Sequence, residues 1–324
     1  MNLPKIGLTL GDPGGIGPEI ILRLLEHPAK LPPAEIVIFG QRQILETWAK
    51  KLGLEAGWLK KAQGEQKIFI QETGVPLKDL VLGFPSAENG QASFSFFQAA
   101  VDSARKGEIQ ALVTAPVSKT SWQLAGIKFR GHTEFLENFF PEAIMSFWSE
   151  RLRLALFTHH LPLKEAINRI KKEALLNFLL ILDKNLHRWS FGVKELLLCG
   201  LNPHAGEAGS MGQEEQQEII PAVVEARARG LNLNGPFPSD TVFLRAIDHP
   251  ERLVVCLYHD QGLIPFKLLS FDSGVNLTLG LPFIRTSPDH GTAFDIAGKG
   301  MANPESLKEA LWLAWRASQA GEKG

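Results

Sequence analysis

The segment Arg252–Lys267, RLVVCLYHDQGLIPFK, decides how the fold is interpreted, because its apolar run stops abruptly at His259 and Asp260. An apolar run that ends in polar residues is typical of a buried parallel strand that delivers side chains to a crevice. Beyond the strand we expect the chain to turn through Gly262 and Pro265. The segment therefore predicts an α/β fold with chemistry at its strand ends.

The same pattern occurs twice more, in LRLALFTHH, which ends at His160, and in ELLLCGLNPH, which ends at His204. Ligands of open parallel sheets bind beyond the carboxyl ends of the strands, so His160, His204 and His259 are expected to converge. Three neutral imidazoles with one open coordination position describe a catalytic metal site. The alternative is that each histidine is a strand-end residue satisfied by the backbone. For three histidines in one structural position we favour the metal site.

Composition limits the class of protein. A chain of 324 residues exceeds the size at which one core usually stops growing, so we expect two lobes with a cleft between them. The net charge of -1 gives no electrostatic reason to bind nucleic acid or an anionic membrane. Cys199 and Cys256 lie in apolar runs, as reduced core thiols do. With neither a signal-peptide pattern nor an apolar stretch of about 20 residues, the chain is expected to be cytoplasmic.

The amino-terminal loop GDPGGIGPE lies between an expected strand at Lys5–Leu10 and an expected helix at about Pro18–Ala29. It lacks the G-x-G-x-x-G pattern, and the next strand, EIVIFGQR, offers no acid for a ribose hydroxyl, so we reject a Rossmann fingerprint. Its glycines either bring backbone N–H groups to an anion or only make a tight turn. A further strand is expected at Ala111–Thr114.

Several hydrogen-bond donors follow in the sequence. The segment GHTE opens a helix, where Thr133 is either a cap or, with His132, a donor to a phosphate. Lys267, Asn276 and Arg285 form a spaced set of donors that suits phosphate or carboxylate, although each alone is also typical of a surface.

Seven motifs, in chain order, resemble those of the 4-hydroxythreonine-4-phosphate dehydrogenase family, the PdxA-type enzymes of vitamin B6 synthesis. They are GDPGGIGPE, ALVTAPVSK, GHTEFL, THHLPL, LNPHAGE, YHDQGL and GVNLTLGLPFIRTSPDHGTA, and they span nearly the whole chain. The resemblance implies the same three metal ligands as the strand ends, His160, His204 and His259. It also implies a phosphorylated substrate held by His132, Thr133, Lys267, Asn276 and Arg285.

The family fold is similar to that of isocitrate and isopropylmalate dehydrogenases, which implies two-lobed α/β/α architecture with a largely parallel, non-Rossmann sheet. HGTAFDIAGKGMANP resembles their adenosine-binding loop, so His290, Gly291 and Thr292 are implied contacts of NAD or NADP. The segment also fits an ordinary glycine-rich loop. By this resemblance the lobe of residues 1–125 plus 275–324 carries the cofactor loop. The lobe of residues 126–274 then carries the metal, the substrate and the contacts of a homodimer with active sites at its interface.

The implied reaction is oxidation of 4-phosphooxy-L-threonine to a 2-amino-3-oxo acid, which decarboxylates to 3-amino-2-oxopropyl phosphate in pyridoxal phosphate synthesis. We expect a divalent metal (zinc, magnesium or cobalt) to lower the pKa of the substrate hydroxyl, so that hydride passes to NAD. Asp240, Asp260 and Lys267 are candidates for the catalytic proton acceptor. Each also has an interpretation as an orienting or capping residue.

Three alternatives stay open at this point. A sister dehydrogenase acting on 4-phospho-D-threonate or 4-phospho-D-erythronate would keep every motif. A metal-dependent hydrolase or lyase would use the histidines to activate water. A non-catalytic protein would only bind a small phosphate ester. The chain also departs from the family pattern at Ser210, where a histidine is usual, and at His159, where a small aliphatic residue or threonine is usual. Neither departure removes a proposed ligand, and both could change selectivity.

Overall fold

The computed structural model describes residues 3–54 and 68–321 and confirms the prediction of an α/β protein with mostly parallel strands. The chain divides into two compact units, Met1–Pro141 with Leu281–Gly324, and Glu142–Gly280. We call them the first and the second unit. The lobe boundaries expected from the sequence were 125/126 and 274/275, whereas the two units meet at 141/142 and 280/281. No helix within the described ranges is long and apolar enough to span a bilayer.

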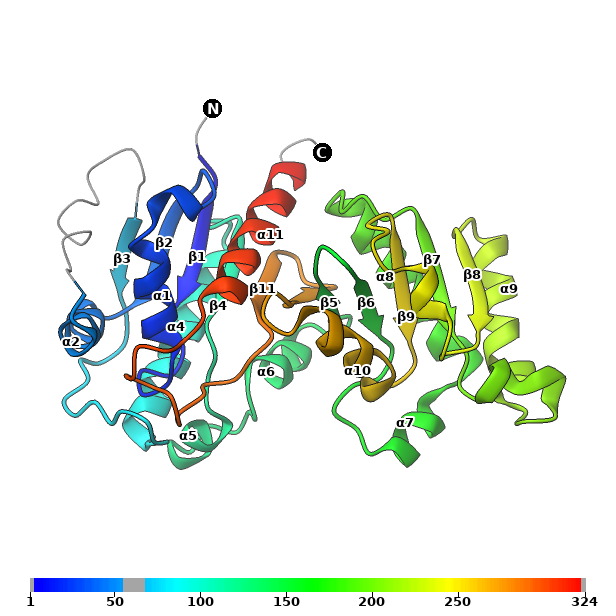
Figure 1. Ribbon diagram of the computed structural model, residues 1–324, viewed down its shortest axis with the longest axis horizontal. Helices are drawn as coiled ribbons and strands as arrows, with labels where there is room; N and C mark the ends of the chain where they lie inside the picture. Colours follow the sequence, from blue (N-terminus) through cyan, green and yellow to red (C-terminus); the bar gives the residue numbers. More distant parts are fainter. Residues whose placement is uncertain (1–2, 55–67, 322–324) are drawn as a thin grey trace. The chain divides into compact units, whose positions relative to one another are not determined.

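The first unit is built on parallel strands in the order β3-β2-β1-β4-β11 (Figure 1). Helix α4 packs on β1, β2 and β4, and α11 packs on β4 and β11. Every residue of β4 is buried, as expected for a strand covered on both faces. The bounds are β1 Lys5–Thr9, α1 Gly17–Leu25, β2 Glu35–Gly40, α2 Arg42–Leu52, β3 Ile68–Glu72, α4 Ala87–Arg105, β4 Ala111–Thr114, α5 Lys119–Leu124, α6 His132–Phe139, β11 Ile284–Pro288 and α11 Glu305–Gly321, with a 3-10 turn at Pro28–Lys30.

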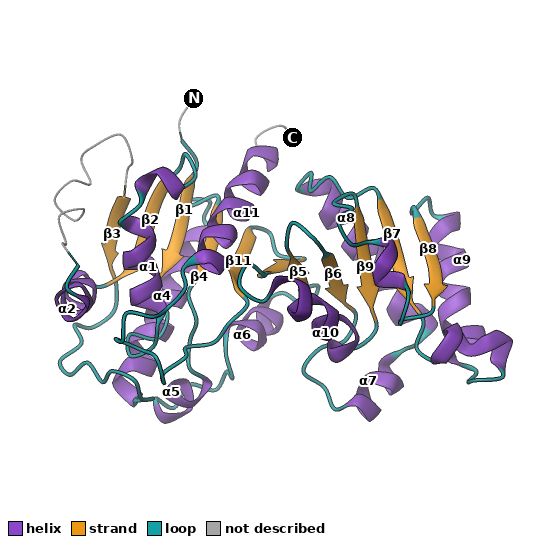
Figure 2. Cartoon of the chain, viewed as in Figure 1, coloured by secondary structure: helices purple, strands orange, loops and turns teal. Residues whose placement is uncertain are grey.

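The second unit has the strand order β10-β5-β6-β9-β7-β8 (Figure 2). β5 pairs antiparallel with β10 and β6, and the remaining pairs are parallel. The strand of the opening segment, β9, lies between β6 and β7, the strands that precede the other two histidines. The bounds are β5 Ile144–Trp148, β6 Arg153–Leu156, α7 Leu163–Arg169, α8 Lys172–Arg188, β7 Glu195–Cys199, α9 Ile220–Ala228, β8 Leu233–Phe237, β9 Arg252–Cys256, α10 His259–Ser270 and β10 Val275–Leu279, with 3-10 turns at Pro203–Gly209 and Val242–Arg245 and a π-helical turn at Glu215–Ile219.

The prediction of a turn through Gly262 and Pro265 is wrong, because helix α10 includes both residues. A proline inside a helix removes one backbone hydrogen bond, so burial must compensate for its loss. Gly262 supplies the close approach that permits this burial. A Cβ there would lie 2.9 Å from Cys256 Sγ, so the helix backbone lies directly on the sheet. Phe266, one turn further on, is fully buried. Packing of α10 on β6 and β9 therefore outweighs the local preference for a turn.

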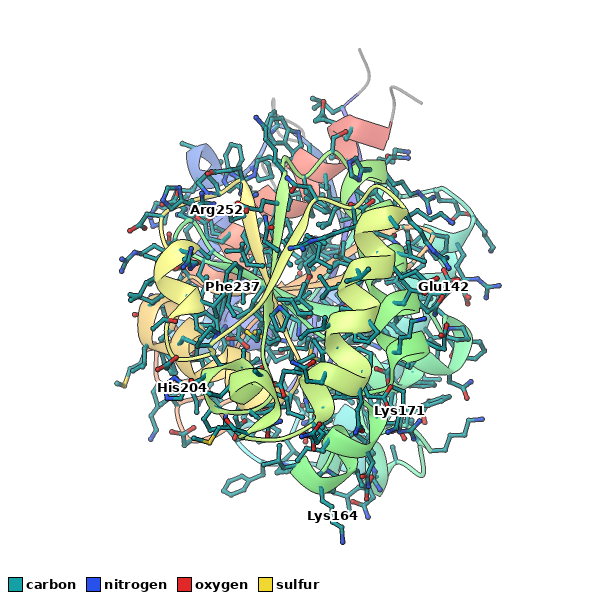
Figure 3. The ribbon with its side chains drawn as sticks, turned by 90° about the vertical axis from the view of Figure 1, so that its right-hand side faces the viewer. Glu142, Lys164, Lys171, His204, Phe237 and Arg252 are labelled. Atoms are coloured by element: carbon teal, nitrogen blue, oxygen red, sulfur yellow. The ribbon has the colours of Figure 1, made fainter. Side chains whose placement is uncertain are left out.

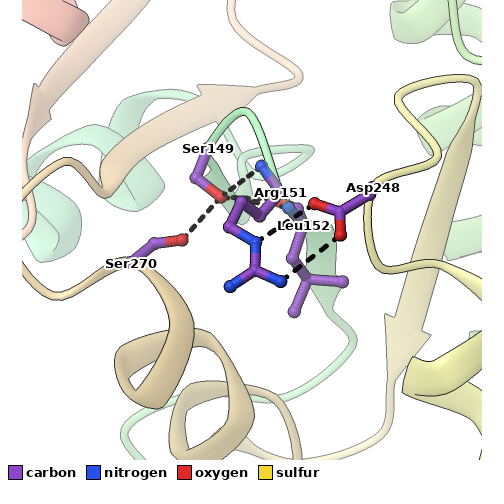
Figure 4. A network of polar contacts seen from close by, with 5 residues as sticks. All are labelled: Ser149, Arg151, Leu152, Asp248 and Ser270. Carbon is purple, nitrogen blue, oxygen red and sulfur yellow. Dashed lines mark hydrogen bonds and ion pairs between the residues drawn. The ribbon is translucent and has the colours of Figure 1, made fainter.

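A polar network anchors the far end of α10 to the turn between β5 and β6 (Figure 4). The Ser270 hydroxyl lies 2.8 Å from Ser149 Oγ, which also accepts from the backbone N–H of Leu152 at 3.0 Å. Arg151 donates to both carboxylate oxygens of Asp248, at 3.1 and 3.3 Å. The ion pair is exposed and contributes little stability, whereas the part-buried serine pair links the last residue of α10 to this turn.

Candidate functional site

A cavity of about 250 Å³ lies in the second unit beyond the carboxyl ends of β6 and β9. Its lining includes both polar and aliphatic side chains. The lining residues are Thr158, His159, His160, Leu161, Leu163, Ala166, Tyr258, His259 and Asp260. This is the position at which open parallel sheets bind ligands.

Two of the three histidines expected to bind a metal meet in this cavity. The ring centroids of His160 and His259 are 5.7 Å apart, and His159 packs edge-on against His160 at 5.3 Å. His160 has a left-handed backbone with φ 48°, which is uncommon for a residue other than glycine. His204 does not line the cavity. Within the part of the chain that the structure describes, no three or more His, Cys, Asp or Glu side chains are grouped to hold a metal.

Asp260 orients the ring of His259. Its carboxylate oxygen Oδ1 lies 2.7 Å from His259 Nδ1. An ionised carboxylate only accepts, so Nδ1 carries the proton and Nε2 keeps its lone pair. A histidine held in this tautomer is prepared to bind a metal through Nε2.

His204 lies on a loop with unusual backbone geometry beyond the end of β7. Figure 3 labels it together with Phe237, the last residue of the neighbouring strand β8. All five residues from His204 to Ala208 are left-handed, with φ between 43° and 81°, and only Gly206 among them is a glycine. Left-handed backbone costs about 1–2 kcal/mol for each residue with a side chain. The loop therefore needs strong anchors elsewhere.

Glu215 provides that anchor, and nothing in the sequence pattern singled it out. Its side chain is fully buried. Oε1 accepts from the backbone N–H groups of Leu201 and Asn202 at 2.8 and 2.7 Å, and Oε2 accepts from Asn202 Nδ2 at 2.8 Å. These three bonds hold the chain just before His204.

Gln261 connects three strand ends and was also missed from the sequence. Its Oε1 accepts from the Leu257 N–H at 2.6 Å, and its Nε2 donates to Gly200 O at 2.8 Å and lies 2.9 Å from Ser239 Oγ. Leu257 follows β9, Gly200 follows β7 and Ser239 follows β8. The exposed Asp240 comes directly after Ser239, so Gln261 contacts the side chain that precedes this candidate base.

A buried cation marks the candidate anion site of the first unit. Arg285 is 3% exposed, and burial lowers the pKa of its guanidinium to about 9. Its Nη2 donates to Thr114 Oγ1 at 2.6 Å and lies 3.2 Å from His132 Nδ1. His132 Nε2 is shielded from solvent and has no hydrogen-bond partner among the described residues. The pKa of His132 lies well below its usual value. Burial of the ring is the larger cause, and the positive charge of Arg285 is the smaller one.

The other expected phosphate ligands are placed as follows. Thr133 is the second residue of α6, directly after His132. Lys267 and Asn276 belong to the second unit. Lys267 Nζ lies 5.8 Å from the ring centroid of Phe271, and Asn276 Oδ1 is buried on β10 without a donor among the described residues. A buried amide oxygen without a donor is what a ligand hydroxyl or ammonium group would satisfy.

The segment expected to bind a cofactor packs against the amino-terminal loop of the same unit. The Ile16 N–H donates to Thr292 O at 2.9 Å, and a Cβ on Gly15 would lie 2.8 Å from Thr292 Cβ. Gly15 is thus required by close packing against Thr292. His290 Nδ1 lies 3.1 Å from the carbonyl of Gly291.

Glu19 extends this support to the following residues. Its carboxylate is fully buried and accepts from the backbone N–H groups of Gly298 and Ala302 at 3.2 and 3.0 Å. Arg23 bonds to Glu19 at 3.3 Å and to the carbonyl of Gly300. Helix α1 therefore holds the candidate cofactor segment in place.

Comparisons with known proteins agree on one family. Residues 33–314 match the family described as pyridoxal phosphate biosynthetic protein PdxA. The 4-hydroxythreonine-4-phosphate dehydrogenase of Desulforapulum autotrophicum is 41% identical over 324 residues, covering 97% of this chain and 95% of that protein. The D-threonate 4-phosphate dehydrogenase of Cupriavidus necator is 41% identical over 319 residues, covering 95% and 96%. A crystal structure of the 4-hydroxythreonine-4-phosphate dehydrogenase from Klebsiella pneumoniae superposes with TM-score 0.84 at 35% identity, covering 98% of both chains.

Proposed function

Since the chain belongs to the PdxA family of dehydrogenases, we propose that it oxidises 4-phosphooxy-L-threonine with NAD or NADP as hydride acceptor. The 2-amino-3-oxo acid formed would decarboxylate to 3-amino-2-oxopropyl phosphate for pyridoxal phosphate synthesis. The observation that carries the proposal is the buried Arg285 beside a shielded His132 nitrogen, which suits a phosphate group. The family resemblance adds Thr133, Lys267 and Asn276 to the residues that hold this phosphate.

A second substrate class is favoured by a specific finding. The D-threonate 4-phosphate dehydrogenase of Cupriavidus necator is as similar to this chain as the relative named for 4-hydroxythreonine 4-phosphate, at 41% identity each. The two substrate classes differ at the carbon next to the carboxylate, which carries an amino group in 4-phosphooxy-L-threonine and a hydroxyl group in 4-phospho-D-threonate. 4-Phospho-D-threonate, or its relative 4-phospho-D-erythronate, is therefore the competing substrate. Hydrolase, lyase and pure binding functions are set aside because the family consists of dehydrogenases.

We assign His160, His204 and His259 as ligands of a divalent cation such as zinc, magnesium or cobalt. Three imidazoles fit the donor preferences of such ions, and the pairing of His160 with His259 supplies part of the site. When bound, the cation would polarise the substrate hydroxyl and the nicotinamide would accept hydride. Asp260 orients His259, which favours this role over that of proton acceptor. Asp240 and Lys267 stay the proposed acceptors.

The dinucleotide would contact the segment that α1 holds in place. We assign His290, Gly291 and Thr292 to it, on the family resemblance and on the rigid support from Glu19. A preorganised backbone lowers the entropy lost when a cofactor binds.

We also infer a homodimer with active sites at its interface. A metal site completed by a second copy of the chain would account for two histidines that meet in the cavity while the third does not line it. Cyclic dimers are the commonest oligomers of soluble enzymes.

A substrate panel tests the function. Purified protein is given NAD or NADP with 4-phosphooxy-L-threonine, 4-phospho-D-threonate or 4-phospho-D-erythronate, and formation of the reduced cofactor is followed at 340 nm. We expect the amino-acid phosphate to have the highest kcat/KM, and a preference for either sugar-acid phosphate would establish the competing function. Chelation should abolish turnover and a divalent ion should restore it. His204→Gln should not recover with added metal, whereas His187→Gln, an exposed histidine on α8, should behave as wild type.

A further inference from the structure

The contact between Arg285 and His132 fixes which nitrogen of the imidazole carries the proton. Arg285 Nη2 lies 3.2 Å from His132 Nδ1 and 2.6 Å from Thr114 Oγ1. A guanidinium has only donors, so Nδ1 must offer its lone pair. The single proton of the neutral ring is then on Nε2. A second proton on Nδ1 would point an N–H group at a cation, which makes the doubly protonated ring unfavourable.

Aromatic side chains hold this ring from the side. The Phe97 ring centroid is 4.4 Å from that of His132, and the Trp122 ring lies edge-on at 5.8 Å. Trp122 is itself fixed, because its indole N–H donates to Ser93 Oγ at 2.9 Å. The imidazole is thus packed too closely to flip without moving its neighbours.

The Nε2 atom is the part of this ring that the protein leaves unsatisfied. It is shielded from solvent and has no hydrogen-bond partner among the described residues. A buried N–H group without an acceptor is unfavourable, so a ligand oxygen that accepts from it recovers this energy on binding.

We propose that Thr114 is a positioning residue that, through Arg285, holds His132 as its neutral Nε2–H tautomer, so that His132 donates one uncharged hydrogen bond to the phosphate of a phosphate monoester. This inference rests on the proposed phosphate-binding role of His132 and Arg285. Thr114 is the last residue of β4 and is fully buried. Its hydroxyl accepts from the same Nη2 that faces His132, so it sets the direction of that nitrogen. Loss of the hydroxyl removes one of the contacts that direct this nitrogen toward the imidazole.

The test combines nitrogen NMR with phosphate binding. Long-range proton–nitrogen spectra of protein labelled with 15N-histidine report the tautomer, and His132→Gln assigns the His132 signals. Inorganic phosphate and 4-phosphooxy-L-threonine are titrated by calorimetry. In the wild type we expect the Nε2–H tautomer before phosphate is added, and a shift of the Nε2 proton on binding. Thr114→Val should give mixed tautomers and bind phosphate about tenfold more weakly, and Thr114→Ser should restore both properties.

The outcomes separate the inference from the function that it deepens. An Nδ1–H tautomer or an imidazolium in the wild type overturns the inference, and so does a Thr114→Val protein with wild-type tautomer and affinity. If the wild type binds neither ligand at His132, the proposed phosphate site is wrong. Thermal unfolding shows whether Thr114→Val is folded. Should it not fold, the wild-type tautomer and the Thr114→Ser titration decide the question alone.

Discussion

Replacing Glu215 by glutamine should loosen the loop that carries His204. Glu215 accepts three hydrogen bonds from Leu201 and Asn202 while fully buried. A bond to a charged group contributes about 1.5–3 kcal/mol and a neutral one about 0.5–1.5 kcal/mol. Two bonds would become neutral. The third bond, from Asn202 Nδ2, would be lost because the new amide N–H₂ is also a donor. If the amide flipped to restore it, the two bonds from the backbone N–H groups would be lost instead. The expected loss is about 2–4 kcal/mol, or roughly 4–8 °C in the midpoint of thermal unfolding.

The variant should also bind metal less well, because the left-handed segment that carries His204 would lose its anchor. Loss of the hydrogen bonds that orient a metal ligand typically weakens metal binding by about 10–100-fold. Circular dichroism measures the unfolding midpoint, and the visible absorption of Co²⁺, titrated against a chelator, measures the affinity. Glu214→Gln is the matched control, since Glu214 is part-exposed and also accepts from Asn202 Nδ2, at 2.8 Å. If the two variants unfold at the same temperature and bind Co²⁺ equally, Glu215 is not the anchor of this loop.

The remaining predictions concern the phosphate, the metal ligands and a buried acid. Arg285→Ala should weaken a phosphorylated substrate by about 1.5–3 kcal/mol more than its dephosphorylated analogue, measured as kcat/KM, and equal losses would place Arg285 elsewhere. Pairwise mixtures of inactive His160→Ala, His204→Ala and His259→Ala proteins should regain part of the activity in at least one pair. If subunit exchange is demonstrated and none recovers, each metal site is built within one chain. Burial raises the pKa of the Asp12 carboxyl, so the folded state binds a proton there more tightly than the unfolded chain does. The free energy of unfolding therefore falls as the pH rises from the ordinary pKa of an aspartate through the raised pKa of the folded state. Asp12→Asn should therefore unfold at a higher temperature than wild type near pH 7, with the difference shrinking toward pH 4. A constant difference would contradict this account.

The sequence by itself determined the local pattern of the fold. The strand expected at Ala111–Thr114 has those bounds in the structure, and β1 ends within one residue of its expected end. The apolar run before His259 is the buried central strand β9. These predictions succeed because the spacing of apolar residues along the sequence indicates which side chains of a strand or helix are buried. The pairing of His160 with His259 also followed from strand ends, since parallel strands deliver their carboxyl ends to one edge.

Only the tertiary structure decided which groups meet over long sequence distances. Helix α10 continues through Pro265 because Gly262 lets it lie on the sheet, and local preference alone predicted a turn. Glu215 is one acid among several in its segment until its partners at 201 and 202 are known. The tautomer of His132 depends on Arg285, which lies 153 residues away in the chain. Hydrogen bonds and charges act through space, so the chemistry of these side chains is set by neighbours that the folded chain supplies.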